Sequence, residues 1–198
     1  MALYTSKYLK NLASNKRSFI NESKRIFSSK TTDMTETFDI FLSHSFLDKD
    51  EVYGIYIELT SKGYTVYVDW IVDSHLNRDN VTKESAELIR SRLKHSKSLL
   101  LGISPSATMS KWIPWELGYV DGNTNSCAIF PVSRETSGEK TFKRSEYLLL
   151  YPYIKLASLE GLSGRIYTVE SSNSYIEFDN WVKYNKDPIF NYKNINIL

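Results

Sequence analysis

The sequence predicts an α/β protein with a mostly parallel sheet, and two observations carry this prediction. Short, almost continuously apolar runs alternate along the chain with amphipathic stretches of helical length. Such runs are typical of strands buried on both faces of a sheet. Their alternation with helices of about ten to fifteen residues is typical of βαβ units. We therefore expect one sheet with helices on both faces.

Five runs are predicted to form the strands. They are rich in β-branched, aliphatic and aromatic residues, and polar or turn-forming residues bound them. The five runs cover residues 38–43, 64–68, 98–103, 127–132 and 146–154.

Helices are predicted between these strands and near the end of the chain. The first would be capped by Asp48 and stop at Gly63, and Thr82 would cap the second. The third would begin near residues 111–114, because Pro114 is tolerated only in a first helical turn. Residues 69–81 are predicted as a long polar loop. A final helix over the sheet is indicated by Tyr175, Phe178, Trp181 and Val182.

The first 30 residues differ from the rest in charge. They carry seven Lys or Arg and one acidic residue, whereas the remainder has 18 basic and 22 acidic residues. Apolar residues at helical spacing predict one or two amphipathic helices over residues 5–28, and residues 28–37 resemble a linker. We therefore divide the chain into an N-terminal basic segment, residues 1–35, and a main domain, residues 36–198, that ends in an extension of a strand and a helix.

A basic segment of this kind could bind nucleic acid, an anionic membrane or an acidic partner. Because the main domain carries the opposite charge, we expect the segment to dock on it instead. We expect no nucleic-acid or membrane partner. No apolar run approaches the roughly 18 residues of a membrane helix, and the single cysteine, Cys127, suits a reducing cytoplasm.

Polar and aromatic residues follow the predicted strands at their carboxyl ends. In an open parallel sheet, ligands bind outside this edge. The residues that should gather there are Ser43, His44, Ser45, Asp69, Trp70, Ser110, Trp112 and Glu116.

Glu116 is the carboxylate of this set. It lies near the start of the third helix, where the helix dipole should keep it ionised. Trp112 lies four positions earlier and would share its face. The competing interpretation is that Glu116 only satisfies the dipole, while Trp112 and Trp115 pack as core.

Other kinds of site are not indicated. The three histidines, His44, His75 and His95, lack metal-ligand spacing among themselves or with Cys127, so no metal is expected. Neither the glycine-rich turn of dinucleotide-binding folds, the P-loop nor the nucleophile elbow of hydrolases occurs.

Three motifs resemble those of TIR (Toll/interleukin-1 receptor-like) domains. They are "FDIFLSHSFLDKDEV", "GYTVYVDW" and "SKWIPWEL", and the last matches the W-x-x-x-E motif of catalytic members through Trp112 and Glu116. The resemblance covers residues 38–132. The chain is most similar to stand-alone bacterial TIR proteins, including those of the Thoeris anti-phage defence system.

The resemblance implies a flavodoxin-like sheet of five parallel strands. Catalytic TIR domains cleave NAD+ at the nicotinamide–ribose bond, and they release ADP-ribose or cyclise it into a signal. Glu116 matches their catalytic glutamate, and residues 43–45 match the loop that borders the NAD+ site. NAD+ is then a substrate, and no cofactor is expected. The family also implies homo-oligomers, in which the loop after the second strand (the BB loop) reaches a neighbour, and a downstream effector that senses the product.

The chemistry is compatible with one carboxylate. Glycosidases need a second one to protonate a poor leaving group, but nicotinamide leaves NAD+ as a neutral molecule. The remaining task is to orient the ribose and stabilise an oxocarbenium-like transition state. Trp70 and Trp112 offer surfaces for base stacking, and an adenine kept in the site could attack the same carbon and close a ring.

Two other functions remain open. The chain could be a non-catalytic TIR adaptor that acts through TIR–TIR contacts, because a fold can be kept when its chemistry is lost. A nucleoside-processing hydrolase on a related fold is the third possible function. Glu116, Trp112 and the polar edge favour the enzyme.

Overall fold

The structure, a computed structural model, describes residues 2–29, 33–44, 49–76, 82–103, 112–124, 126–134, 148, 150–157, 164–171 and 174–183. Among these residues, no helix has the length and apolar character needed to cross a membrane.

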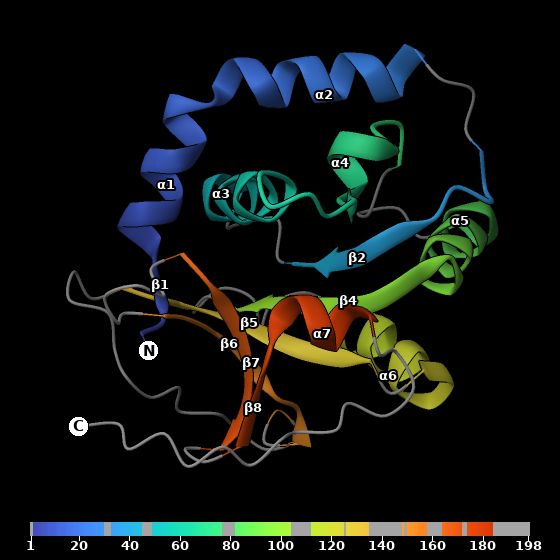
Figure 1. Cartoon of the computed structure of the whole chain (residues 1–198). Coiled ribbons are helices and arrows are strands. Elements are labelled where there is room, and N and C mark those ends of the chain that lie inside the picture. The colour runs from blue at the N-terminus through green and yellow to red at the C-terminus, as the bar shows by residue number, and fades with distance from the viewer. Residues whose placement is uncertain are drawn as a thin grey trace.

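Five parallel strands form the centre of the sheet, and Figure 1 labels β2, β4, β5 and β6 among them. Their order is β3-β2-β4-β5-β6, so the second predicted strand lies on one side of the first and the other three lie on the opposite side. This is the 2-1-3-4-5 order of flavodoxin-like folds, and the predicted fold class is confirmed. The strands are β2 (Phe38–Ser43), β3 (Val66–Tyr67), β4 (Ser96–Ile103), β5 (Cys127–Ser133) and β6 (Tyr153–Leu156).

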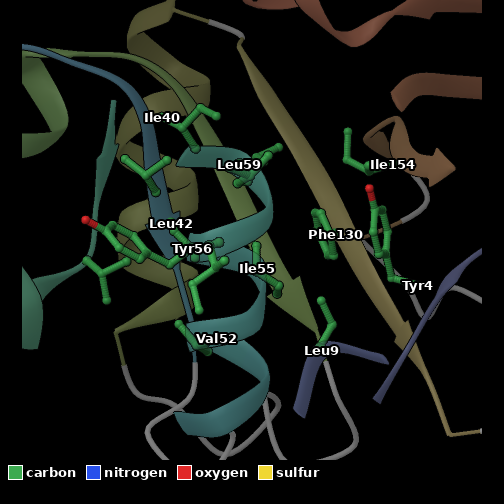
Figure 2. Packing of buried hydrophobic residues seen from close by; sticks show 14 of the residues in the cluster. Tyr4, Leu9, Ile40, Leu42, Val52, Ile55, Tyr56, Leu59, Phe130 and Ile154 are labelled. Carbon is green, nitrogen blue, oxygen red and sulfur yellow. The ribbon is translucent and has the colours of Figure 1, made fainter. Parts of the chain in front are cut away.

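Each face of the sheet has its own apolar cluster under its own helices. Figure 2 shows the first cluster, in which Ile40 and Leu42 of β2 face Ile55 of the helix α3. Phe41 belongs to the second cluster, together with residues of α5 and α6. Neighbouring residues of β2 therefore point to opposite buried faces, which explains its continuous apolar pattern. The helices are α3 (Lys49–Thr60), α4 (Asp69–Val72), α5 (Lys83–Lys94) and α6 (Ile113–Thr124).

Local signals set several helix ends. Thr82 caps α5, and its side chain accepts a hydrogen bond from the Ser85 backbone N–H. Gly63 has a φ of 92°, a left-handed conformation that favours glycine, and it follows the end of α3. The third helix begins at Ile113, within the predicted window. Asp48, the predicted cap of α3, lies outside the described residues.

The N-terminal segment docks on the first face, as expected from its charge and its apolar stripe. It forms β1 (Tyr4–Thr5), α1 (Ser6–Asn15) and α2 (Arg17–Ser29). β1 pairs in parallel with β5, and α1 packs against α3. The helices approach so closely that a Cβ at Gly54 would lie 2.4 Å from the Leu9 carbonyl oxygen.

Three predictions about secondary structure need correction. The fifth strand begins at Tyr153 rather than near residue 146, because Pro152 cannot donate to a ladder and is confined to strand ends or edges. The loop after β3 opens with the short helix α4. Tyr175 lies in a strand, β8 (Ser174–Glu177), and not in the final helix α7 (Phe178–Lys183).

The sheet also continues beyond the parallel strands. β7 (Ile166–Ser171) and β8 add to β6 in antiparallel fashion. A strand and a helix were predicted after the fourth strand, but these two antiparallel strands were not. Phe178 and Trp181 of α7 are buried in the first cluster, so the final helix does cover the sheet.

Candidate active site

The carboxylate of Glu116 and the hydroxyl of Ser43 meet at the carboxyl edge of the sheet. Ser43 is the last residue of β2, and Glu116 lies in the first turn of α6. The Ser43 hydroxyl donates to Glu116 Oε2 at 2.6 Å, and both residues are 0% exposed. O–H···O hydrogen bonds in proteins are about 2.5–3.0 Å long, so this one lies at the short end of the range. The end of β2 therefore holds the carboxylate of α6 in a fixed orientation.

A second group of predicted residues gathers beside this pair. The Nδ1 atom of His44 lies 2.8 Å from the Leu42 carbonyl oxygen, and Nε2 lies 3.3 Å from Asp69 Oδ1. Because a carbonyl oxygen only accepts, Nδ1 carries a hydrogen. The half-buried Trp70 ring meets the His44 ring edge-on, with centroids 4.1 Å apart. The stretch after β2 and the start of α4 are thus joined through three side chains.

The prediction placed Trp112 on the same helical face as Glu116, but the structure places it just before α6. Its carbonyl oxygen accepts the Glu116 N–H at 2.9 Å, so it stands just before the first helical residue. Its ring meets Trp115 edge-on at 5.6 Å and packs against the second apolar cluster. Both tryptophans therefore pack against the core, as the competing interpretation expects. Ser45 and Ser110 lie outside the described residues.

A buried ion pair supports the end of α4, and sequence reasoning missed it. Arg92 donates from Nε and Nη2 to the two carboxylate oxygens of Asp73, each at 2.9 Å. Tyr67 also donates to Asp73 at 3.0 Å. Burial lowers the pKa of Arg92, but the hydrogen bonds and charge of Asp73 outweigh it and leave this pKa above its ordinary value. A buried ion pair offsets the cost of removing both charges from water only when its geometry is good, and the bidentate contact provides that geometry.

The remaining candidates have structural roles. His95 is the C-cap residue of α5. Cys127 is buried in β5, and burial raises the pKa of its thiol, so it stays protonated and unreactive. In the described part of the chain, no group of three or more His, Cys, Asp or Glu side chains is arranged to hold a metal ion.

The arrangement suits electrostatic stabilisation of a developing positive charge. A fixed, buried carboxylate lies at the edge where parallel sheets bind ligands, beside an imidazole and an indole. A carboxylate of this kind can stabilise positive charge that develops on a ribose carbon, and the indole offers a face for a planar base.

The family of the chain follows from comparison with known proteins. The TIR domain profile matches residues 40–160, more than half of the chain, and the chain belongs to this family. It is 41% identical over 157 residues to "Probable 3' cyclic ADP-D-ribose synthase ThsB'" of Bacillus cereus (strain MSX-D12). That match covers 79% of this chain and 81% of the relative. The resemblance carried by residues 38–132 is thereby confirmed.

A second relative has a related description. "Putative cyclic ADP-D-ribose synthase TIR2" of Cytobacillus dafuensis is 24% identical over 144 residues. The match covers 67% of this chain and 38% of that protein, so the chain spans well under half of its length. A solved metazoan TIR-STING receptor from C. gigas covers 50% of this chain at 17% identity and a TM-score of 0.33, which is too low to support a conclusion.

Proposed function

We propose that the chain cleaves NAD+ at the nicotinamide–ribose bond and converts the ADP-ribosyl group into a cyclic nucleotide. The observation that carries this proposal is the buried Glu116 carboxylate, held by Ser43 at the carboxyl edge of the sheet. The 41% identical relative, whose name describes a cyclic ADP-D-ribose synthase, supports the same reaction class.

The reaction balances without a cofactor. Nicotinamide leaves with the electrons of the C–N bond, and the ribose carbon becomes oxocarbenium-like. Glu116 stabilises that charge, and a hydroxyl oxygen then attacks the carbon and releases its proton to water. Primes in nucleotide names denote ribose positions. A 3' product, as in the name of the relative, would therefore be closed by a ribose hydroxyl and not by the adenine ring.

The test is incubation with NAD+, followed by chromatography and mass spectrometry of the products. We expect nicotinamide together with a product that is lighter than ADP-ribose by one water. ADP-ribose alone would show a hydrolase. An absence of turnover at every protein concentration, with Glu116→Gln indistinguishable from the wild type, would favour the adaptor function.

We further propose that the active form is a homo-oligomer in the cytoplasm and that its product acts through a separate effector. Support comes from the TIR family and from the mixed charge of residues 69–80, which suits contact with a neighbouring copy. Turnover per molecule should rise with protein concentration over the same range in which light scattering detects larger assemblies. Constant specific activity of a monomer from nanomolar to micromolar concentration would contradict this proposal.

A further inference from the structure

Helix α4 carries two candidate site residues, yet it is only one turn long. Asp69 and Trp70 open it, and it ends at Val72. Helices much shorter than about 12–15 residues have no stability of their own in water, so contacts with other elements set the position of α4. Two lines of contact lead to the N-terminal segment, which precedes the stretch that matches the TIR family.

The first line is a chain of ring contacts. Helix α2 packs against α4 (Figure 1). Lys24 of α2 places its Nζ 5.2 Å from the ring centroid of Tyr53. The Tyr53 ring meets Trp70 edge-on at 5.9 Å, and Trp70 meets His44 at 4.1 Å. These contacts therefore connect α2 with His44, the residue next to Ser43.

The second line passes through Arg92. The guanidinium that binds Asp73 also donates from Nη1 to the Asp33 carbonyl oxygen at 2.6 Å. Asp73 follows the last residue of α4, and its N–H donates to the Asp69 carbonyl oxygen at 2.7 Å. One guanidinium, 1% exposed, thus joins the linker after α2 to the end of α4.

The linker is itself held in shape at this point. The Asp33 side chain accepts from the Thr35 backbone N–H at 2.8 Å and from the Thr35 hydroxyl at 2.7 Å. Ser91 of α5 donates to the Met34 carbonyl oxygen at 2.7 Å. This local turn fixes the direction of the Asp33 carbonyl group, which is the group that Arg92 binds.

We propose that the N-terminal segment positions α4 at the active site, and that Tyr53 and Arg92 are the positioning residues through which it acts. Its kinetic consequence rests on the proposed function. When the linker loosens, Asp69 and Trp70 shift relative to the Glu116–Ser43 pair, and NAD+ binds more weakly while the carboxylate stays in place. A partner that displaced the segment would shift Asp69 and Trp70 through the same contacts.

The test uses the exposed Asp33 side chain, whose replacement leaves the core intact. Asp33→Ala removes the turn, and we expect KM for NAD+ to rise about threefold or more while kcat stays within about twofold. Backbone amides of residues 70–73 should exchange hydrogen faster at an unchanged Tm. Asp33→Asn keeps the acceptor oxygen, so it should restore wild-type values in both measurements.

A matched control lies at the opposite edge of the sheet. Glu177→Ala removes the exposed ion pair with Arg165 and should change neither KM nor exchange at residues 70–73. If hydrogen exchange is faster in Asp33→Ala but no variant turns over NAD+, the positioning role stands and the proposed function is rejected. Unchanged exchange and unchanged KM in both Asp33→Ala and Arg92→Lys would overturn the proposal. So would an activity that falls only in proportion to lost folded protein.

Discussion

Glu116 and Glu58 are both buried carboxylates on helices that flank the sheet, yet their surroundings differ. Glu58 of α3 is 6% exposed and accepts hydrogen bonds from Tyr4 at 3.0 Å and Tyr8 at 2.8 Å. Its ammonium neighbour, Lys62, lies 3.4 Å away. Glu58 therefore fastens the N-terminal segment to α3.

Glu116 accepts from Ser43 at the end of a strand, beside the His44–Asp69–Trp70 group. The two carboxylates share burial and hydroxyl donors, so these properties alone do not identify an active site. The place of the carboxylate in the fold makes the difference, because ligands bind parallel sheets at the carboxyl edge.

Neutralising each carboxylate in turn tests whether its place in the fold decides activity. Glu116→Gln should reduce NAD+ turnover about a thousandfold or more, because the charge that stabilises the transition state is lost. Glu58→Gln should keep kcat within about threefold of the wild type. Product formation is measured by chromatography, and circular dichroism checks the fold. Equal losses in the two variants would show that burial, and not position, decides activity.

Trp112→Ala tests how far packing near Glu116 matters. A fully buried aromatic side chain contributes about 3–5 kcal/mol, and we expect less here because Trp112 is only half-buried. Turnover should fall together with Tm, since the Trp112 ring packs on Trp115 and the second cluster. A large loss of turnover at an unchanged Tm would instead indicate a direct contact with the substrate.

Glu58→Leu should lower stability more than activity. It leaves the Tyr4 hydroxyl, on a residue that is 2% exposed, without its acceptor. A buried donor that loses its partner costs about 1–3 kcal/mol of the free energy of unfolding. Urea unfolding measures the loss, and Glu58→Gln, which keeps an acceptor oxygen, should lose less. Equal stability of the three proteins would contradict the fastening role.

The smallest expected effect concerns alkaline pH. Burial and the hydrogen bond to Glu58 raise the pKa of Tyr8 from 10.0 to about 12, and they also raise the pKa of Tyr4. The folded state therefore holds these protons more tightly than the unfolded state, and stability falls as pH rises above 10. Tm measured from pH 9 to 11 should decline less steeply in Tyr8→Phe than in the wild type. An identical slope in both proteins would exclude a contribution of Tyr8.

The sequence predicts the parts of this protein that depend on nearby residues. Continuous apolar runs predict the parallel strands, and Pro114 predicts where α6 begins, so Glu116 can be placed at the edge of the sheet. Ser43 follows from the same argument, because it ends the first strand. Their direct contact was expected only as proximity, and the structure shows it as a hydrogen bond.

Contacts between distant residues could not be predicted in this way. Arg92 and Asp73 look like ordinary surface charges in the sequence, because nothing nearby shows that both are buried and paired. The partners of Glu58 lie about fifty positions away, in a segment that carries its own helical pattern. The antiparallel strand β8 has only four residues, and Thr168 and Glu170 break up the apolar run of β7.

The pairing of β1 with β5 has a consequence for how the chain folds. Tyr4 lies opposite Val132, so β1 has no strand to join until the chain has been made as far as β5. Contacts this far apart in sequence close large loops and slow folding. Until then, the apolar side chains of Leu3 and Tyr4, which are buried in the folded protein, stay exposed to water and to neighbouring nascent chains, and such exposure favours aggregation. The yield of folded protein should therefore depend partly on the step that pairs β1 with β5.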